Sequence, residues 1–373
     1  MKTSTSRILT THVGSMVRPP DIQAMIRDNK LDESLLKRSV AEVVKQQAEA
    51  GIDIPSDGEY SKSSFSNYAN ERLSGFESKQ GVSPVTGTGR DRKAFADFYL
   101  EYEGPTPSSS VVCTGPIEYI GQALLQRDID NFTAAMAPAN VDEAFIPAVA
   151  PGTMALQRKN QHYRTEEEYI FAVADAMKEE YRTIVEAGFI LQIDDPRLVT
   201  QYDTMDPAPT IEDYRKLVAL RIEALNGALA GLPRDRIRYH MCWGSWHGPH
   251  TTDIEMKHLI DLILTIHAGA VSFEAANPRH EHEWTVWETV KLPQDTVIIP
   301  GVIAHTTNHV EHPELVAQRL ANFARLVGKE NVIAGCDCGF SQGALNPRVH
   351  ASIMWAKFDA LAKGAALASK QLF

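Results

Sequence analysis

Short apolar runs alternate along the chain with segments whose apolar positions follow helical spacing. Leu36, Val40 and Val44 lie on one face of such a segment, and their spacing predicts a helix. Gly51 ends this helix, and the run IDIPSDGE follows as a predicted strand. The same order of helix, short loop and strand recurs, with further helices predicted over 165–187, 210–229, 253–268 and 313–327.

This recurring order predicts parallel strands joined by crossover helices. Eight such units favour an α/β fold of the (β/α)8 TIM-barrel type over an open, doubly wound sheet. The eight candidate strands are RILTTHVG, IDIPSDGE, AFIPAVAP, FILQIDDP, IRYHMCWG, AVSFEAAN, TVIIPGVI and VIAGCDCGF.

The domain organisation is expected to be simple. No Ser-, Gly- or Pro-rich stretch is long enough to separate two domains, so residues 1–373 are expected to form one domain. A ninth apolar run, SSVVCTGPIEYI, lies in a stretch too long for an ordinary loop. Residues 60–143 are therefore predicted to be an insertion after the second strand, with Cys113 outside the barrel. The insertion could instead form a lid over the barrel mouth.

Charge and hydropathy narrow the class of partner. The 373 residues include 37 Lys and Arg against 48 Asp and Glu, a formal net charge of −11. This acidic balance argues against nucleic acid or an anionic membrane as a partner, so small molecules are expected. No apolar run approaches the roughly 20 residues of a membrane helix, and the N-terminal segment lacks the apolar core of a signal peptide. The protein is expected to be cytoplasmic, and a homo-oligomer is compatible with the sequence.

Titratable residues gather at the C-terminal ends of the predicted strands, where barrel enzymes hold their active sites. Strand ends can also be polar because loops begin there, but the size of this set favours an active site. The set consists of His12, Ser15, Asp57, Glu59, Asp194, Asp195, His240, Cys242, Glu274, His305, Asp337 and Cys338.

The spacing of His240 and Cys242 is the strongest indication of a metal site. Residues two apart in a strand point to the same side, so an imidazole and a thiol would converge, as zinc requires. Glu274 and Cys338, from other strand ends, would complete a shell of one nitrogen, one oxygen and two sulfurs. An HxC pair alone also fits buried structural residues. The CxC pair leaves Cys336 open as a ligand, but Cys338 lies closer to the strand end and is preferred.

The order of these motifs resembles the catalytic C-terminal barrel of the cobalamin-independent methionine synthase family. The HMC motif, an isolated strand Glu and the DCG motif resemble its zinc site, and THVGS, DGE and QIDDP resemble its IGS, HGE and IDEP segments. The single-barrel length and the CWGSWHGPH segment look closer to a subgroup that includes epoxyalkane:coenzyme M transferase. The resemblance implies Zn²⁺ held by His240, Cys242, Glu274 and Cys338, and an amino-acid thiol held by Ser15, Glu59 and Asp194.

The expected chemistry is S-alkylation of a thiol. A free thiol with a pKa near ~8.5 is mostly protonated at neutral pH, and zinc coordination removes its proton. A site with two thiolates and a carboxylate suits nucleophilic sulfur better than hydrolysis. The first hypothesis is therefore a zinc-dependent methyltransferase that acts on an amino-acid thiol such as homocysteine with a small-molecule alkyl donor. The alternatives are an epoxyalkane:coenzyme M transferase-like enzyme that opens an epoxide, and a ligand-binding barrel with structural zinc.

Two segments depart from the family pattern. Methionine synthases stack the folate pterin on a Trp, whereas the corresponding stretch APGTMALQRKN has no aromatic residue, which favours a donor other than folate. Ala304 and Thr306 replace an Asp-x-His pair, and His305 between them could replace the proton donor. His305 and Asp194 are the catalytic candidates. Further substrate-binding candidates are His12, Arg18 and Trp243, with Arg18 or Arg279 expected to bind an anionic group.

Overall fold

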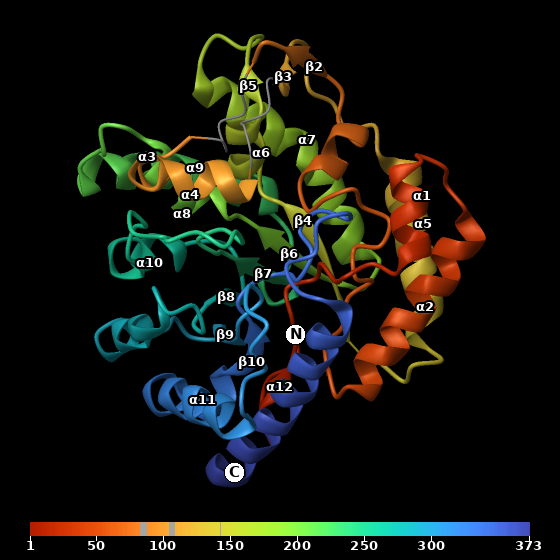
Figure 1. Ribbon diagram of the computed structural model, residues 1–373, viewed down its shortest axis with the longest axis vertical. Helices are drawn as coiled ribbons and strands as arrows, with labels where there is room; N and C mark the ends of the chain where they lie inside the picture. Colours follow the sequence, from red (N-terminus) through yellow and green to blue (C-terminus); the bar gives the residue numbers. More distant parts are fainter. Residues whose placement is uncertain (83–87, 104–108, 142) are drawn as a thin grey trace.

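The computed structural model describes residues 1–373 except 83–87, 104–108 and 142. At its centre, seven strands form one parallel sheet in the order β1-β10-β9-β8-β7-β6-β4, surrounded by helices (Figure 1). The strands are β1 (Leu9–Thr10), β4 (Phe145–Val149), β6 (Ile190–Asp194), β7 (Ile237–His240), β8 (Ala270–Glu274), β9 (Val297–Ile303) and β10 (Ile333–Cys336).

The run around Ile54 fills the gap between the two edge strands of this sheet. Thr11, just after β1, forms a parallel bridge with Ile54. The backbone N–H of Phe145 in β4 donates to the carbonyl of Pro55 at 3.0 Å. The sheet therefore curls round as a barrel, and the prediction of a TIM-barrel fold built from these eight runs is confirmed.

Apolar residues fill the N-terminal end of the barrel, and polar side chains lie at its C-terminal end. A separate core cluster lies at the N-terminal ends of the strands. The functional candidates lie at the opposite, C-terminal ends, so the fold places them on one face. The cluster consists of Ile54, Phe145, Ile190, Ala270, Val297, Ile299 and Ile333.

Most predicted helices form as expected because their caps and apolar faces agree. The hydroxyl of Thr165 accepts a hydrogen bond from the N–H of Glu168 at 3.0 Å and so begins the longest helix before β6. The predicted helices correspond to α2 (Glu33–Glu49), α7 (Glu166–Glu186), α9 (Ile211–Leu229) and α11 (Pro313–Val327). The other helices around the barrel are α1 (Pro20–Arg27), α5 (Gln122–Met136), α6 (Pro151–Gln157), α8 (Arg197–Thr204) and α12 (Ala351–Leu372).

The continuous helix predicted over 253–268 is wrong. Only the short elements η4 (Met256–His258) and α10 (Ile260–Ile263) form there. The hydroxyl of Thr265 donates to the carbonyl of Leu262 at 2.6 Å, a local bond that competes with helical pairing. The remaining short turns are η1 (Asn67–Glu71), η3 (Arg234–Arg236), η5 (Glu281–Glu288) and η6 (Lys329–Asn331).

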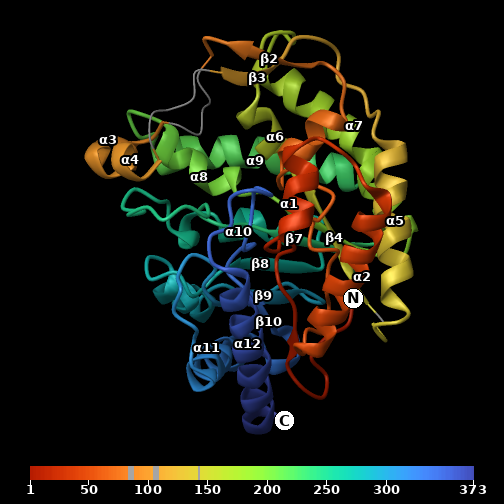
Figure 2. The same ribbon diagram turned by 45° about the vertical axis from the view of Figure 1, so that its right-hand side comes forward.

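The stretch 60–143 contains both a small sheet and a helix that packs on the barrel; its residues 83–87, 104–108 and 142 lie outside the described ones. β2 (Phe76–Gln80) pairs antiparallel with β3 (Ser109–Cys113), which pairs in parallel with β5 (Lys159–Asn160). This sheet lies apart from the barrel strands, at the top of Figures 1 and 2. Cys113 is therefore outside the barrel sheet.

The rest of this stretch approaches the barrel from its side. α5 packs against α2 as a helix of the barrel's outer ring, whereas α3 (Arg90–Ala94) and α4 (Ala96–Glu103) pack near α8. None of the described helices is both long and apolar enough to cross a membrane.

Candidate metal and substrate site

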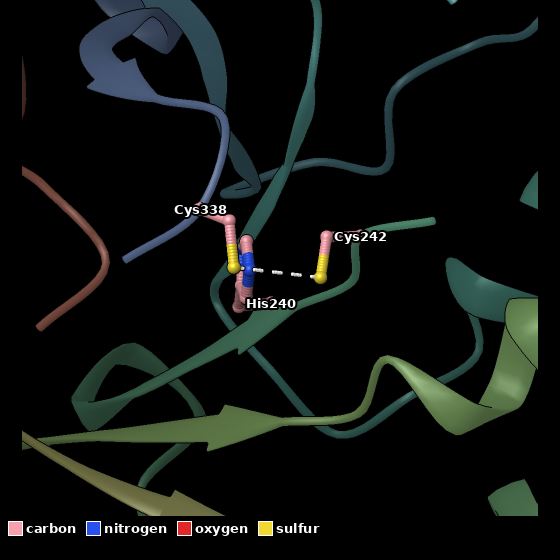
Figure 3. Close-up of side chains that lie close together, drawn as sticks. All are labelled: His240, Cys242 and Cys338. Atoms are coloured by element: carbon pink, nitrogen blue, oxygen red, sulfur yellow. Dashed lines mark hydrogen bonds between the residues drawn. The ribbon is translucent and has the colours of Figure 1, made fainter. Parts of the chain in front are cut away.

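His240, Cys242 and Cys338 converge at the C-terminal ends of β7 and β10 (Figure 3). Their candidate ligand atoms all lie within 4.8 Å of one another, and all three side chains are buried. The two sulfur atoms are 3.5 Å apart, well beyond the roughly 2.05 Å of a disulfide, so both cysteines are free. An imidazole and two thiols at this spacing suit a borderline-soft metal such as zinc.

The orientation of His240 fits a metal ligand. Its Nδ1 lies 3.1 Å from the hydroxyl of Ser272 on the neighbouring strand β8. Its Nε2 is buried and has no hydrogen-bond partner among the described residues. A buried polar atom without a partner is costly, and metal-bound histidines characteristically use their second nitrogen for such an orienting contact. The residues present therefore fit a metal ion between the imidazole and the thiols.

The two thiols differ in their tendency to ionise. The hydrogen bond between the sulfur atoms holds the pKa of Cys338 well below the usual thiol range, and His240 acts in the same direction. The same sulfur contact, together with burial, raises the pKa of Cys242 well above that range. The sulfur contact therefore favours ionisation of Cys338 over that of Cys242.

Glu274 lies at the end of β8, next to this cluster but not within the group of three. One carboxylate oxygen accepts from the backbone N–H of Trp243 at 3.0 Å, and the other accepts from the side-chain amide of Asn277 at 2.7 Å. Burial raises the pKa of Glu274 well above its usual value, and the nearby charges of Asp337 and Cys338 add to this shift. A fourth ligand from Glu274 stays a prediction.

A cavity of about 180 Å³ opens onto the cysteines. Glu59 and Asp194, from two other strand ends, line the same space. The complete lining is Val13, Ser15, Glu59, Phe65, Asp194, Pro196, Arg197, Thr200, His240, Cys242, Gly244, Ser245, Trp246, Cys338, Gly339, Gln342 and Arg348.

Glu59 and Asp194 form an acidic pair in this cavity. Glu59 has a positive φ of 57°, so the turn after Gly58 sets the direction of its side chain. One oxygen of Glu59 has no hydrogen-bond partner among the described residues, although Arg18 and Lys62 each lie 3.9 Å from the carboxylate. Burial and the charge of Glu59 raise the pKa of Asp194 well above its usual value. An ammonium group of a ligand would relieve this repulsion.

His305 follows β9 and is buried, with neither ring nitrogen hydrogen-bonded within the described part of the chain. Burial lowers its pKa to about 4, partly offset by the charge of Cys338. The ring is therefore neutral at physiological pH. The sequence did not show whether the side chain of His305 points into the site. The charges of Cys338 and His240 act on its pKa, which indicates that its ring lies beside the cluster of His240, Cys242 and Cys338.

His12 and Trp243 do not line the cavity. The Nε2 of His12 lies 2.6 Å from the side-chain oxygen of Gln47, and burial lowers its pKa to about 3. The indole N–H of Trp243 donates to the carbonyl of Ile254 at 2.7 Å, and its ring stacks on His280. Both side chains have partners within the protein, so the structure does not bring them to the cavity.

Arg18 and Ser15 belong to one buried network. Arg18 donates to the hydroxyl of Ser15 at 2.9 Å and to the carbonyl of Glu59 at 2.7 Å. Ser15 lines the cavity, but its hydroxyl donates to the carbonyl of Ser341. Arg18 thus supports the loops that carry Ser15 and Glu59 and does not itself line the cavity. Arg279, the other candidate for an anionic group, donates to the carbonyl of His250 at 3.0 Å.

A profile of the family described as "Cobalamin-independent synthase, Catalytic domain" matches residues 111–354. The chain belongs to this family. The predicted family relationship is thereby confirmed, as is the expectation of an enzyme that transfers methyl groups.

The chain is also similar to curated proteins and to a solved structure. The chain is 26% identical over 341 residues to the methionine synthase of Saccharolobus solfataricus, covering 88% of this chain and 87% of that protein. It is 26% identical over 373 residues to the methionine synthase of Sulfurisphaera tokodaii, covering 97% and 93%. A B12-independent methionine synthase structure from Shewanella sp. W3-18-1, in complex with selenomethionine, superposes with a TM-score of 0.75 at 18% identity and covers 98% of this chain and 99% of that one. That likeness confirms the shared fold.

Two charged residues that line the cavity, Arg197 and Arg348, were not predicted from the sequence. Arg197 directly follows the QIDDP segment at the start of α8, and Arg348 lies in the loop after β10. The position of Arg197 beside a strand end was a usable signal, because residues there face the same side as the active site. Arg348 is ten residues beyond Cys338, and its sequence gave no comparable indication.

Proposed function

We propose that the protein is a zinc-dependent methyltransferase that alkylates an amino-acid thiol such as homocysteine. The observation that carries this proposal is the meeting of two groups in one cavity. The possible metal ligands His240, Cys242 and Cys338 share this cavity with the acidic pair Glu59 and Asp194. A thiol and an ammonium group on the same small molecule match these two features.

The metal would be held by His240, Cys242 and Cys338, with Glu274 proposed as the fourth ligand. Bound zinc would lower the pKa of a substrate thiol, so that its sulfur reacts as a thiolate at neutral pH. Ser272 fixes the imidazole of His240, and Asn277 and the backbone of Trp243 hold the carboxylate of Glu274.

Glu59 and Asp194 would bind the substrate ammonium. The free carboxylate oxygen of Glu59 supplies a hydrogen-bond acceptor, and the raised pKa of Asp194 lets its carboxyl hold a proton until the ammonium replaces it. The relatives named methionine synthases, and the solved relative with selenomethionine bound, support an amino-acid ligand with a sulfur or selenium side chain.

His305 is the proposed residue for proton transfer. Its neutral ring offers one N–H that can be donated and one lone pair that can accept. Both ring nitrogens lack hydrogen-bond partners among the described residues, so either can form a hydrogen bond with a substrate atom that lies beside Cys338. His305 would thus take up the thiol proton and return a proton to the leaving group of the donor.

The methyl donor is proposed to differ from folate. The segment that begins α6 contains Met154 and Leu156 but no aromatic residue on which a pterin could stack. An epoxide remains the second candidate electrophile, because opening an epoxide with a thiolate needs no pterin site. A panel of methylated small molecules, methyl-folate and epoxides, each tested with homocysteine, would identify the donor class.

A cysteine substitution tests the proposal directly. Cys242→Ser is expected to lower both the metal content, from about one zinc per chain, and the rate of methyl transfer, because it removes a thiolate ligand. Cys113→Ser is the matched control, since Cys113 lies in β3 outside the barrel and should retain both. Full activity in Cys242→Ser would contradict the proposal.

A further inference from the structure

Two buried polar residues, Gln192 and Arg238, lie one layer below the groups that line the cavity. In β6, Gln192 precedes Asp194 by two residues, so both side chains point to the same side of the sheet. In β7, Arg238 precedes His240 in the same way, and the register pairs Gln192 with Arg238. Further down β6, Ile190 belongs to the apolar cluster. The two polar side chains therefore lie between the apolar end of the barrel and the cavity.

Arg238 is buried, and its hydrogen bonds to the described residues go to neutral oxygens. Its Nε donates to the side-chain oxygen of Gln192 at 2.7 Å. Its Nη1 donates to the hydroxyl of Thr11 at 2.9 Å, and its Nη2 donates to the carbonyl of His12 at 2.6 Å. The guanidinium also lies over the ring of Phe145, 3.3 Å from its centroid. A buried charge held by neutral groups costs stability, so packing alone does not account for Arg238.

The amide of Gln192 connects Arg238 to Asp194. A guanidinium can only donate, so the amide oxygen of Gln192 faces Arg238 and the amide nitrogen faces away. That nitrogen donates to the carboxylate of Asp194 at 2.7 Å and to the carbonyl of Val13 at 2.5 Å, which uses both of its hydrogens. Burial lowers the pKa of Arg238 to about 9, and the charge of Asp194 acts to raise it. Arg238 thus sets the direction of the amide, and the amide holds one oxygen of Asp194.

We propose that Arg238 is a positioning residue that acts through Gln192 to hold the carboxylate of Asp194 for the ammonium group of the acceptor thiol. It would thereby favour amino-acid thiols over thiols without an ammonium group. The inference rests on the proposed function, because it concerns the acceptor in the same cavity. Asp194 lines the cavity, whereas Arg238 and Gln192 do not. Without Arg238, the amide would be free to turn its oxygen toward Asp194, and two acceptors would then face each other.

Calorimetry with two matched ligands tests this role. Homocysteine and its deaminated analogue, which keeps the thiol and the carboxylate, are titrated into the zinc-loaded wild-type protein and its variants. Arg238→Met is expected to bind homocysteine roughly 10- to 100-fold more weakly, the range for loss of a charged hydrogen bond, and the analogue within about two-fold of wild type. Arg238→Lys keeps a charged donor and should recover part of the affinity for homocysteine.

Arg158→Met is the matched control. Arg158 is as buried as Arg238 and donates to the amide oxygen of Asn70 at 2.6 Å, but it does not line the cavity. Its substitution removes a comparable buried guanidinium and should leave the affinity for both ligands unchanged.

A substitution of Gln192 separates the amide contact from a general loss of packing. Gln192→Met removes the amide at similar side-chain length and should cause the same selective loss of affinity for homocysteine. The double variant of Arg238→Met and Gln192→Met should lose no more than Gln192→Met alone, because Arg238 acts through that amide. Replacing both polar partners by apolar groups costs less stability than leaving one unpaired, so the double variant carries the test if Arg238→Met does not fold.

Each other outcome overturns the inference in a distinct way. An equal loss of affinity for both ligands, or a loss of zinc, would mean that Arg238 supports the whole site and not Asp194. Unchanged affinity for homocysteine in folded Arg238→Met would show that Asp194 needs no such support. A double variant that binds homocysteine more weakly than Gln192→Met would show that Arg238 acts by another route. If wild-type protein binds neither thiol, or both equally, the proposed function itself fails, and this result is distinguishable because it involves no substitution.

Discussion

At the scale of single residues, the contact between Ser272 and His240 supports the metal site most directly. The hydroxyl lies 3.1 Å from Nδ1, which leaves Nε2 to face the cysteines. Ser272→Ala is expected to lower zinc affinity about 10- to 100-fold, because loss of an orienting contact has this effect at comparable sites. Competition with a chromophoric chelator measures the change. Ser110→Ala, in the outer strand β3, should leave zinc affinity as it is, and an equal effect of both variants would contradict the orienting role.

Burial of Asp57 makes stability depend on pH. Burial raises the pKa of Asp57 to about 6, above the unfolded value of 3.8. The folded state therefore holds the proton more tightly, and this residue costs stability as pH rises from about 4 to about 6. Asp57→Asn keeps an acceptor for the N–H of Glu59 and should stabilise the protein at pH 8 by up to about 3 kcal/mol, but not at pH 3.5.

Urea unfolding at several pH values measures this difference. The exposed Asp97→Asn is the control and should show no such pH dependence. A constant difference between Asp57→Asn and wild type across the pH range would refute the assignment.

A site residue could be predicted from the sequence where the backbone conformation alone sets the direction of its side chain. His240 and Cys242 were predictable because strand alternation puts both on one side, and the structure brings their ligand atoms close together. The direction of His305 was not predictable, since it depends on packing around a loop between distant strands, whereas the place of Arg197 directly after the QIDDP strand end was a usable signal. His12 and Trp243 also lie near strand ends, yet hydrogen bonds to Gln47 and Ile254 take their polar atoms away from the cavity.

At the scale of elements, the loop after β7 is tied to the helices of the 60–143 stretch. The carboxylate of Asp91 in α3 accepts from the backbone and hydroxyl of Thr251 at 2.9 and 2.6 Å and from the hydroxyl of Tyr99 at 2.7 Å. Tyr99 in turn accepts from the indole of Trp246 at 2.9 Å. A Cβ on Gly244 would lie 1.8 Å from that indole, so the glycine makes room for the Trp246 ring.

This network predicts that Asp91 keeps the cavity wall in place. Asp91→Ala is expected to speed hydrogen exchange in residues 243–252 by at least about ten-fold, because several hydrogen bonds to one buried charge are lost. It should also weaken thiol binding while the zinc content stays unchanged. Asp97→Ala in α4 serves as the control. Exchange rates that stay at wild-type values would show that the loop is held independently of α3.

The elements themselves were predictable where capping and apolar spacing agreed. α7 and α9 begin after Thr165 and Thr210, whose hydroxyls accept from the backbone three residues on. The segment before β8 has a suitable apolar pattern too, but β-branched residues and the bond from Thr265 to Leu262 shorten it to α10. The spacing of apolar residues does not show that a side-chain hydrogen bond competes with the backbone bonds of the helix.

For the whole molecule, the closed sheet predicts a fold that does not depend on zinc. Backbone hydrogen bonds join the seven barrel strands to one another, the run around Ile54 bridges the two edge strands, and apolar side chains fill one end of the barrel. Chelation of zinc is expected to lower Tm by a few degrees, because the ion binds the folded state alone, while the far-UV circular dichroism at 25 °C stays the same. Unfolding on chelation would instead favour structural zinc in a ligand-binding barrel.

A substrate sulfur is expected to join a metal held by His240, Cys242 and Cys338. X-ray absorption at the zinc edge, recorded on the zinc-loaded protein with and without homocysteine, measures this directly. We predict one additional sulfur neighbour at about 2.3 Å when homocysteine is present. A zinc shell that is the same with and without saturating homocysteine would contradict the claim.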